Sequence, residues 1–569
     1  MKATDRHKLI DRINSLEGLT DDERSALLGL LREHKTYGLV WEDKPEEVEE
    51  HLRNELPVLI EDKDKALTEA GPEAPNHILI EGDNLEALAT LAYTHAGKID
   101  VIYIDPPYNT GNKDFIYNDS YVDSEDSYRH SKWLSFMSRR LRIAKKLLSD
   151  RGVIFISIDD NEISQLKLLC DEVLGQSNFI SQFIWKKKQG GGNDSNRVVI
   201  EHEYVLCYAS SFDSQLGLDT KYELDPKLYP FKDEKGEYGL ITLDKASIQI
   251  SQSLIYDIVG PNGKIYRPRI VKGKQSCWRW SKTKVETQYD ELVFKNDKVY
   301  TKYYRPKGVV PRSLLVESRF GRTESGNDDI KDVFGNKPFG YPKPLFLVKH
   351  LLSLGIGTTI LDFFAGSGTT LHAVMQLNAE DGGKRRCILC TNNENGICEN
   401  VTYERNKRVI QGYTKPNGVH VEGLKDNNLR YYRTDFVSRN RSTKNMRRLV
   451  QLSTDMLCIK ENLYDEQKTF AGMPTYKNIY RYFTHGEQKM LIIYDERYVD
   501  EIVKLINSVE TSEKIKVYVF SPSEDPWEAC FEAVNDKVEL CALPQAIYNT
   551  YRRILPKKQI EPTKKGGDE

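Results

Sequence analysis

The sequence lacks the features of a membrane or secreted protein. No apolar run among its 569 residues approaches the roughly 20 residues that a bilayer-spanning helix needs. The first residues, Met1-Lys2-Ala3-Thr4-Asp5-Arg6-His7, lead into no apolar signal-peptide core. Hydrophobic residues make up 39% and charged residues 29%, which is ordinary globular usage. We therefore expect a cytoplasmic protein of about three to four domains that makes no contact with a membrane.

Cysteine is scarce and forms no framework. The nine cysteines are scattered along the chain, which favours a reducing compartment. Cys387 and Cys390, with Cys398 nearby, invite a zinc hypothesis. Residues three apart in a strand, however, point to opposite faces, and no second pair or histidine follows. We predict no metal site.

A short polar motif follows the apolar run at 99–104. It reads Asp105-Pro106-Pro107-Tyr108, and its two prolines fix φ and remove two backbone donors, so the turn is stiff. The Asp105 carboxylate and the Pro106 carbonyl can accept both hydrogens of an aromatic amino group, which makes that nitrogen nucleophilic. Tyr108 can stack on an extrahelical base. The motif predicts a pocket for a flipped-out adenine; the alternative is a merely stiff turn.

A glycine-rich motif lies at 358–370. It is typical of a buried strand, a glycine turn and a helix that begins near Thr369. Gly366 and Gly368 let the backbone approach a nucleotide-like ligand at the end of a parallel strand. A phosphate-binding loop needs lysine where Thr369 stands, and a dinucleotide fingerprint needs glycine where Leu371 stands. S-adenosylmethionine fits instead. The candidate cofactor residues of this motif are Asp362, Phe364, Ala365, Gly366, Ser367, Gly368 and Thr369.

The next predicted strand, at 386–391, ends in Asn392-Asn393-Glu394. An acidic residue at the end of the second strand is the position from which such folds hold ribose hydroxyls. We therefore predict that Glu394 binds the ribose, with an ordinary surface glutamate as the alternative.

Because it contains both motifs in this order, the chain resembles the permuted beta class of amino-group DNA methyltransferases, in which the target-base motif precedes the cofactor motif. More closely, it resembles the modification subunits of type III restriction-modification systems and their solitary adenine-specific relatives. The likeness covers roughly residues 37 to 415. Five further stretches carry it: 37–42, 76–88, 109–112, 152–160 and 341–344.

The resemblance implies an α/β fold: a doubly wound, Rossmann-like methyltransferase sheet with permuted motif order and an inserted target-recognition domain. Beyond the likeness, apolar runs at 489–494 and 514–520, with a helical pattern at 498–509 between them, predict a small C-terminal α/β domain. The resemblance assigns the catalytic pocket to the motif 105–108. It also implies that Asp83 lies near the cofactor's adenine and that Lys343 and Pro344 lie beside its methionine portion. Asp105 favours adenine, because relatives that methylate the amino group of cytosine more often carry serine there.

The net charge of -3 hides a basic segment. From 260 to 284 there are eight basic residues and no acidic one, with Tyr266, Trp278 and Trp280 interleaved. This pattern favours phosphate contacts with stacking side chains, and the family it resembles inserts its target-recognition domain here. A glycine-rich loop at 185–194 is a second candidate for contact with DNA. We expect it to cover the flipped base after DNA binds, while its lysines contact phosphates. The predicted DNA-binding residues are Lys186, Lys187, Lys264, Arg267, Arg269, Lys272, Lys274 and Arg279.

Two other stretches are ambiguous. The arginine-rich stretch from Arg430 to Arg448 either reaches DNA or forms a solvated helix face. His202-Glu203 begins an apolar strand, and we interpret this pair as structural and leave it outside the active site.

The expected domain organisation follows from these motifs and from changes in composition. The boundaries are an N-terminal helical segment at 1–70, the target-base half of the sheet at 71–211, the target-recognition domain at 212–337, the cofactor half at 338–418, the C-terminal α/β domain at 419–556 and a disordered tail at 557–569.

The sequence therefore predicts a site-specific DNA methyltransferase. It would transfer a methyl group from S-adenosylmethionine to N6 of adenine in double-stranded DNA, by base flipping and direct in-line transfer, with no metal required. A restriction-modification or related epigenetic system is the expected setting, with a homodimer and a separate restriction subunit as candidate partners. The alternatives are a methyltransferase that acts on RNA or a protein amide, and a non-catalytic DNA-recognition subunit.

Overall fold

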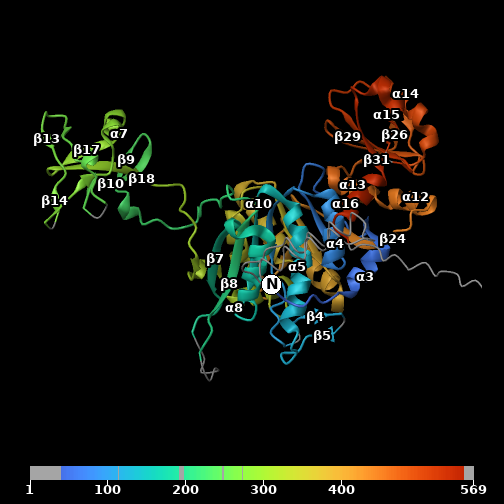
Figure 1. The fold of residues 1–569 in the computed structure, drawn as a ribbon, viewed down its shortest axis with the longest axis horizontal. Coiled ribbons are helices and arrows are strands. Elements are labelled where there is room, and N and C mark those ends of the chain that lie inside the picture. The colour runs from blue at the N-terminus through green and yellow to red at the C-terminus, as the bar shows by residue number, and fades with distance from the viewer. Residues whose placement is uncertain are drawn as a thin grey trace, which may run out of the picture. The chain divides into compact units, whose positions relative to one another are not determined.

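The computed structural model describes residues 40–555, apart from 113, 119, 191–197, 247, 248, 272 and 524. The chain forms two compact units (Figure 1). The second unit is Gly217–Pro311, and the first is made from the chain on both sides of it. Residues 1–39 of the helical segment expected at 1–70, the expected tail and Lys272 lie outside the described residues. The described part of that segment contains helix α3 Glu47–Asn54 but also strand β1 Glu55–Glu61, which pairs into the large sheet, so the expectation of a helical segment is wrong there.

A ten-stranded sheet organises the first unit, with strand order β1-β24-β2-β21-β20-β3-β6-β8-β7-β19. The row from β24 to β6 is parallel throughout, whereas β8 is antiparallel to both β6 and β7. The predicted α/β sheet is thus confirmed. The strands are β1 Glu55–Glu61, β24 Asn428–Ser438, β2 Asn76–Glu81, β21 Arg386–Thr391, β20 Thr359–Asp362, β3 Ile99–Ile104, β6 Leu148–Ile158, β8 His202–Ala209, β7 Phe179–Lys186 and β19 Leu314–Leu315.

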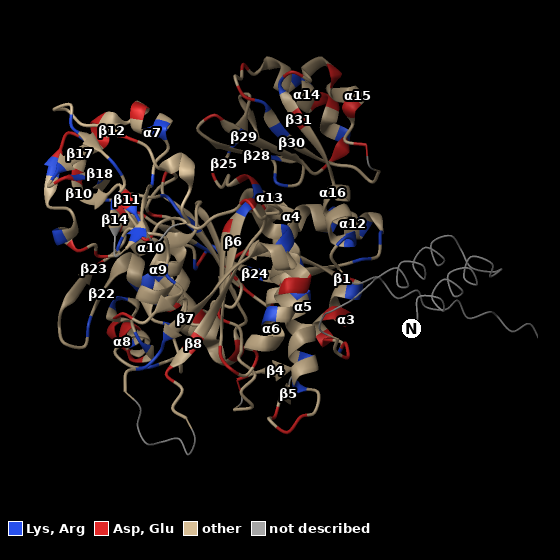
Figure 2. Ribbon diagram, turned by 60° about the vertical axis from the view of Figure 1, so that its left-hand side comes forward, with Lys and Arg blue, Asp and Glu red and all other residues tan. Residues whose placement is uncertain are grey.

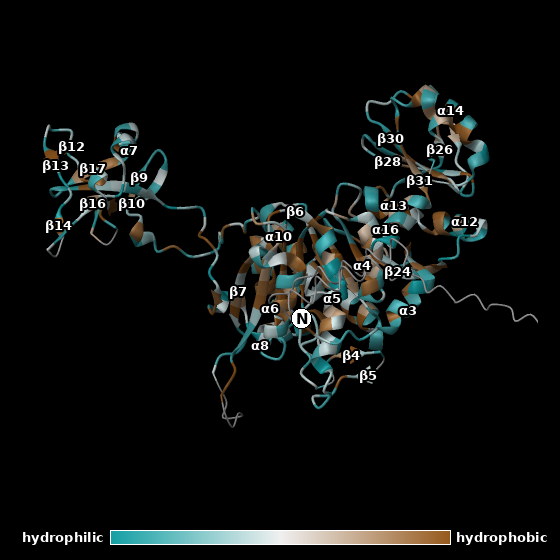
Figure 3. Ribbon diagram, viewed as in Figure 1, coloured by the Kyte–Doolittle hydropathy of each residue, from teal (hydrophilic) through white to brown (hydrophobic). Residues whose placement is uncertain are grey.

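The sheet has a hydrophobic core on each face, because successive side chains of a strand point to opposite sides. In β3, Ile102 and Ile104 join one core, while Val101 and Tyr103 join the other. Figure 3 shows apolar residues concentrated on these strands and the helices beside them. The first core includes α4 Asn84–Thr94, α5 Arg129–Leu147 and α6 Ile163–Cys170, and the second includes α9 Leu345–Leu354, α10 Thr369–Asp381 and α11 Glu404–Gln411.

The parallel order brings the two predicted motifs to one edge of the sheet. β20 lies directly beside β3, with Ile360 opposite Val101 and Leu361 opposite Ile102. The residues that follow the two strands therefore emerge side by side. The carboxyl ends of β21 and β2 come next along the same edge, since these strands are also parallel. This is the edge at which open α/β sheets bind ligands.

The second unit is built on the antiparallel sheet β17-β18-β10-β9 and two-stranded ribbons. Its small core contains Leu243, Trp278 and Val299. The unit is shorter than the expected 212–337, because β19 and α8 (Thr323–Phe334) belong to the first unit. The four strands are β17 Leu292–Lys295, β18 Lys298–Tyr304, β10 Gly236–Thr242 and β9 Phe231–Asp233.

The C-terminal part carries a five-stranded sheet, β25-β28-β29-β30-β31, with the predicted strands and intervening helix present. The expected boundary at 419 differs from the structure, because β24 belongs to the large sheet. Tyr551 Oη also donates to the carbonyl of Pro57 in β1 at 2.6 Å. The elements are β25 Glu466–Gln467, β28 Tyr480–His485, β29 Gln488–Ile493, α14 Val499–Ser508, β30 Ile515–Phe520, β31 Val538–Leu543 and α16 Gln545–Arg552.

Helix α4 connects the C-terminal part to the large sheet. Every residue of α4 after Asn84 is buried. The helix packs against both β1 and α16, and its residues share one core with Met490, Phe520 and Tyr551. The first core of the large sheet therefore continues into the C-terminal part, whose sheet has a further core on its other face.

Within the described part of the chain, no helix is both long enough and apolar enough to cross a membrane.

The shared core makes a prediction for Leu88, which is fully buried in α4. Leu88→Ala should reduce the free energy of unfolding of the first unit by about 2–5 kcal/mol, because it leaves a cavity. Ile356→Ala, at a site 53% exposed, should change it by within about 0.5 kcal/mol. Urea denaturation, followed by fluorescence and circular dichroism, measures both. Separate transitions for the large sheet and the C-terminal part, of which only one shifts, would contradict the shared core.

Candidate active site

The motif after β3 is held rigidly from two sides. Tyr108 Oη lies 3.0 Å from Asp105 Oδ1, so the ring is fixed relative to the carboxylate. Trp133 of α5 donates its ring N–H to the carbonyl of Pro107 at 2.7 Å. Asn109, with φ of 57°, is buried, and its amide donates to Glu162 Oε1 at 2.5 Å. The turn is therefore supported by α5 and by the segment after β6.

The structure corrects the interpretation of Glu203. The carboxylate of this residue, at the start of β8, lies in the site, with Oε2 3.1 Å from Tyr108 Oη. The reason is strand direction: β8 is antiparallel to β6, so its first residues emerge at the edge where the parallel strands end. The sequence does contain one signal for this role, an acidic residue at the start of an apolar strand. It does not reveal the direction of that strand in the sheet, which decides the edge at which the residue lies.

Lys343 completes the site from the segment before α9. Its Nζ lies 3.0 Å from Asp105 Oδ1 and 3.3 Å from Glu203 Oε2. The same ammonium lies 4.8 Å from the centroid of the Tyr108 ring. Asp105, Tyr108, Glu203 and Lys343 are called the pocket cluster below. The side chain of Lys343 thus faces the predicted base pocket, while its backbone carbonyl accepts from Thr369 Oγ1 at 3.5 Å.

Burial and charge act against each other in the pocket cluster. Burial raises the pKa of Asp105, the Lys343 ammonium opposes that rise and the Glu203 carboxylate adds to it. Burial would also raise the pKa of Glu203, but Lys343 and Lys187 outweigh it and bring that pKa below its ordinary value. Burial would lower the pKa of Lys343, yet the two carboxylates raise it. The lysine is therefore firmly charged, and Asp105 is the carboxylate that is harder to ionise.

The loop after β20 requires its two glycines. Gly366 and Gly368 have φ of 47° and 72°, a left-handed conformation that side chains disfavour. A Cβ on Gly368 would lie 2.5 Å from Asn406 Nδ2 and 3.1 Å from the Thr402 carbonyl. Thr402 Oγ1 donates to the Gly366 carbonyl at 2.6 Å. The loop is thus bare backbone, held by the helical segment that follows β21.

Arg405 is a second support of this loop that the sequence did not reveal. Its buried guanidinium donates to Thr369 Oγ1 at 2.7 Å and to the Ser367 carbonyl at 3.3 Å. Burial lowers the pKa of Arg405 to about 10. The residue stands in a helix rich in charged side chains, so no sequence signal distinguished it from its neighbours.

Asp362 stabilises the same loop by accepting hydrogen bonds from residues on both sides of the two glycines. Its Oδ1 accepts from the Phe364 amide at 2.9 Å, and its Oδ2 accepts from Thr370 Oγ1 at 2.5 Å. Burial raises the pKa of Asp362 to about 7. Ala365 adds a link to the neighbouring strand, because its amide donates to the Cys390 carbonyl at 3.1 Å.

Asp83 caps α4 at the carboxyl end of β2. Its Oδ1 accepts from the Leu85 amide at 2.7 Å, and the next residue, Asn84, donates to the Phe363 carbonyl at 3.1 Å. Arg140, which is 1% exposed, lies 3.5 Å from Asp83 and 2.9 Å from Glu46. These contacts connect the end of β2 to the loop after β20 and to the segment before β1.

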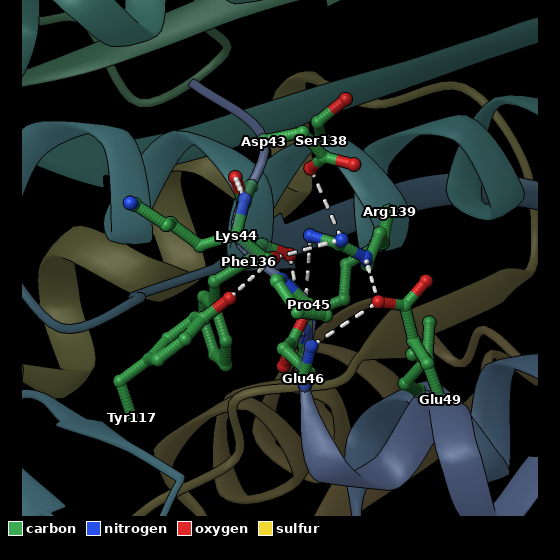
Figure 4. Close-up of polar contacts among 12 residues, drawn as sticks. Asp43, Lys44, Pro45, Glu46, Glu49, Tyr117, Phe136, Ser138 and Arg139 are labelled. Atoms are coloured by element: carbon green, nitrogen blue, oxygen red, sulfur yellow. Dashed lines mark hydrogen bonds and ion pairs between the residues drawn. The ribbon is translucent and has the colours of Figure 1, made fainter. Parts of the chain in front are cut away.

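That segment, at 41–49, is tied to α5 by Arg139 (Figure 4). Arg139 Nη2 donates to the Lys44 carbonyl at 2.9 Å and to Asp43 at 3.1 Å, and its Nε lies 2.7 Å from Glu49. Tyr117 Oη donates to the same Lys44 carbonyl at 2.5 Å. The resemblance had included residues 37–42, but it gave no role to this arginine.

The remaining predicted cofactor residues lie near the same edge. Pro344 immediately precedes α9, and Phe364 has its ring 5.8 Å from that of Phe136. Glu394 lies just after β21 and is exposed. The predicted residues of the cofactor motif and of the base motif thus come from adjacent strands.

Three of the five predicted DNA-binding cations that the structure describes in the second unit already have acidic partners. Arg269 forms two hydrogen bonds of 2.8 Å with Asp244, and Arg267 forms two of 2.6 and 2.9 Å with Asp257. Figure 2 shows the two charge signs intermixed over this unit. The other residues are Lys264, which pairs with Asp297, and Lys274 and Arg279, which are exposed and form no ion pair among the described residues.

Cations of the first unit are similarly engaged. Lys186 lies 3.8 Å from Glu201, and Lys187 lies 3.2 Å from Glu203. In the arginine-rich stretch, Arg430 lies 2.6 Å from Glu61 and Arg447 lies 2.8 Å from Glu496. The stretch is divided between two settings. Arg430 and Arg433 lie in β24, next to the edge strand β1, whereas Lys444 and Arg448 are exposed on helix α12 (Thr443–Leu452), as the expectation of a solvated helix face has it.

Comparisons with known proteins agree with this geometry. The N6/N4 methyltransferase family model, described as DNA methylase, matches residues 99–415. The StyLTI Mod subunit of Salmonella typhimurium, a type III restriction-modification enzyme, is 36% identical over 355 residues, 56% of this chain and 52% of that subunit. The EcoPI Mod subunit of Escherichia phage P1, also type III, is 33% identical over 395 residues, 59% and 60% of the two chains. The type II methyltransferase M.KpnI of Klebsiella pneumoniae is 36% identical over 357 residues, which are 58% of this chain and 84% of that methyltransferase. The chain thus spans between half and two thirds of the two Mod subunits.

The raised pKa of Asp362 gives a pH-dependent stability. The folded protein keeps this proton up to a pKa of about 7, whereas the ordinary value is 3.8. Stability from this group is therefore present below pH 3.8 and is lost as pH rises toward 7. Asp362→Asn should remove that loss, so its stability relative to wild type should rise with pH, by at most about 1.4 kcal/mol per pH unit.

Urea denaturation between pH 5 and pH 8 measures this difference. Asp381→Asn is the control, because the pKa of Asp381 is lowered by Arg385 and the group stays ionised throughout that interval. A constant difference between Asp362→Asn and wild type would show that Asp362 titrates normally.

Proposed function

Because the chain belongs to this N6/N4 family of DNA methylases, we propose that it transfers a methyl group from S-adenosylmethionine to N6 of adenine in double-stranded DNA. The observation that carries the proposal is the pairing of β3 with β20, which sets a pocket for an amino group beside a glycine loop. Donor and acceptor of the methyl group need this proximity, since direct transfer requires the two reacting atoms to meet in line.

The residues present fit S-adenosylmethionine. The loop at 366–369 offers backbone without a Cβ at its two left-handed positions, which is what close approach of a ligand needs. Beside this loop, Pro344 and the backbone of Lys343 would contact the methionine portion. Asp83 would lie near the adenine, and Glu394 would hold the ribose hydroxyls. When bound, the cofactor supplies a methyl group on a positively charged sulfur.

The motif 105–108 fits the amino group of a flipped adenine. The Asp105 carboxylate and the Pro106 carbonyl would accept its two hydrogens, and the Tyr108 ring would stack on the base. Held in this way, the nitrogen would present its lone pair to the methyl carbon; transfer would leave S-adenosylhomocysteine, and the methylated amino group would lose its extra proton to solvent. Sulfonium chemistry of this kind requires no metal.

DNA recognition belongs, in this proposal, to the second unit, with its exposed cations and aromatic residues. The relatives named above include type III Mod subunits and a type II methyltransferase. A restriction-modification system is therefore the setting that we propose. A restriction subunit and a second copy of this chain are the partners that we propose with it.

The central prediction concerns Asp105. Asp105→Ala should reduce methyl transfer by about 10²–10⁴-fold, because the amino nitrogen loses its principal acceptor. Affinity for S-adenosylmethionine should stay within a few fold. Asp150→Ala is a control on the same sheet, since Asp150 is exposed at the other end of β6.

Expression in a methylase-free host, followed by sequencing that detects modified bases, measures activity and identifies the recognition sequence. Calorimetric titration measures the affinity for the cofactor. Full methylation of the host DNA by the Asp105→Ala variant would overturn the assignment of the pocket, and unmethylated adenine with the wild-type chain would overturn the function.

A second prediction uses the ion pairs of the second unit. The double change Lys274→Ala and Arg279→Ala should weaken DNA binding and flatten its salt dependence, by about 0.9 in the log–log slope for each phosphate that the protein no longer neutralises. Arg267→Ala should alter the slope less, because this guanidinium is already neutralised by Asp257. Titrations at several salt concentrations measure the slopes. An unchanged slope in the double variant would move DNA binding away from these residues.

A further inference from the structure

The pocket cluster holds two carboxylates around one ammonium. Asp105 is the acceptor to which the proposed function assigns the target amino group. In this structure its Oδ1 lies 3.0 Å from both Lys343 Nζ and Tyr108 Oη. An adenine amino group that enters the pocket must therefore displace donors that are already there.

Lys343 reproduces the features by which the target base would be recognised. Its ammonium is an N–H donor to Asp105, as the amino group would be. It also lies over the Tyr108 ring, 4.8 Å from the centroid, where it gains a cation–π contact. The lysine and the base thus compete for the same carboxylate and the same aromatic ring.

Every donor that Asp105 would release already touches Glu203. Oε2 of Glu203 lies 3.3 Å from Lys343 Nζ and 3.1 Å from Tyr108 Oη. A hydroxyl has one proton, so Tyr108 donates to one of the two carboxylates at a time. Glu203 is itself anchored through its other oxygen, 3.2 Å from Lys187 Nζ. A second acceptor is therefore prepared for both donors.

We propose that the Lys343 ammonium holds the place of the target amino group in the DNA-free protein, and that Glu203 keeps this ammonium when the base enters. This inference rests on the proposed function. The exchange replaces the Lys343–Asp105 contact by an amino–Asp105 contact, so the ammonium keeps a counterion in Glu203 and the Asp105 carboxylate keeps a hydrogen-bond donor. A buried cation that lost its only counterion would be strongly disfavoured, so Glu203 lowers the free energy needed to open the pocket. Glu203 is thus a positioning residue for base entry.

Four variants test the exchange in the full chain. Glu203→Gln keeps the shape and an acceptor for Tyr108 but removes the charge that receives Lys343. Lys343→Met removes the placeholder, and the double variant combines both changes. Glu201→Gln is the matched control, because Glu201 lies two residues away and pairs with Lys186. Binding of S-adenosylhomocysteine confirms that each variant is folded.

The measurement compares two duplexes that carry the recognition sequence found by sequencing the host DNA. One has adenine at the target position and the other has an abasic residue there, and S-adenosylhomocysteine is present in both titrations. The ratio of the two affinities isolates entry of the base from the other contacts with DNA. Alkaline buffer keeps Asp105 ionised in all variants.

Glu203→Gln should lower the adenine-to-abasic ratio by about tenfold, the effect of a charged hydrogen-bond partner. Lys343→Met should not lower it, and in the Lys343→Met background Glu203→Gln should change it by less than about twofold. Equal losses in both backgrounds would overturn the exchange, as would a ratio unchanged by Glu203→Gln. A lower ratio for Lys343→Met would overturn the placeholder role.

A second readout covers the case in which Lys343→Met fails to bind S-adenosylhomocysteine. Single-turnover methyl transfer should be slowed by Glu203→Gln and largely restored by Glu203→Asp, which keeps the charge. Equal slowing by both variants would overturn the proposal. Failure of the wild-type chain to methylate adenine would instead be a failure of the proposed function, so the two outcomes are distinguishable.

Discussion

The parallel pairing of β3 with β20 is the constraint on which the rest of the site depends. These strands belong to distant parts of the chain, with the whole second unit between them. Their hydrogen-bonded register sets Ile360 against Val101, so the residues after both strands emerge together. The motif that contains Asp105 and the loop that contains Gly366 owe their proximity to this pairing. The order of the two motifs along the chain does not affect this proximity, because a sheet sets its neighbours by strand pairing and not by order along the chain.

The second constraint on the site is that its charged side chains are poorly solvated and must neutralise one another. The side chains of Lys343 and Glu203 are each 12% exposed, so neither charge is well hydrated. Each carboxylate and each ammonium of the pocket cluster therefore needs a partner, and Lys187 supplies the fourth charge. In the glycine loop, the buried Arg405 donates to loop oxygens through Nη1, while its Nε has no hydrogen-bond partner in the described part of the chain.

The surroundings of the site connect it to the remainder of the first unit. Asp83 caps α4 at the carboxyl edge of the sheet, and α4 is buried between β1 and α16. The C-terminal part is thus packed against the helix whose first turn lies at the site. In the second unit, a count of basic residues overstates the charge that is free for phosphates, since Arg267 and Arg269 are each held by an aspartate.

The sequence by itself determined the features that depend on local chemistry: the strand Ile99–Ile104 before Asp105, the strand Thr359–Asp362 before two glycines, and the helix that begins at Thr369. Apolar runs, prolines and glycines restrict the backbone wherever they stand, so these elements could be read directly. Only the tertiary structure decided that Glu203 joins the pocket, that Lys343 turns its ammonium to Asp105, and that Arg405 supports the loop. Those contacts depend on the antiparallel direction of β8 and on pairing between charges far apart in the chain, which no local pattern encodes.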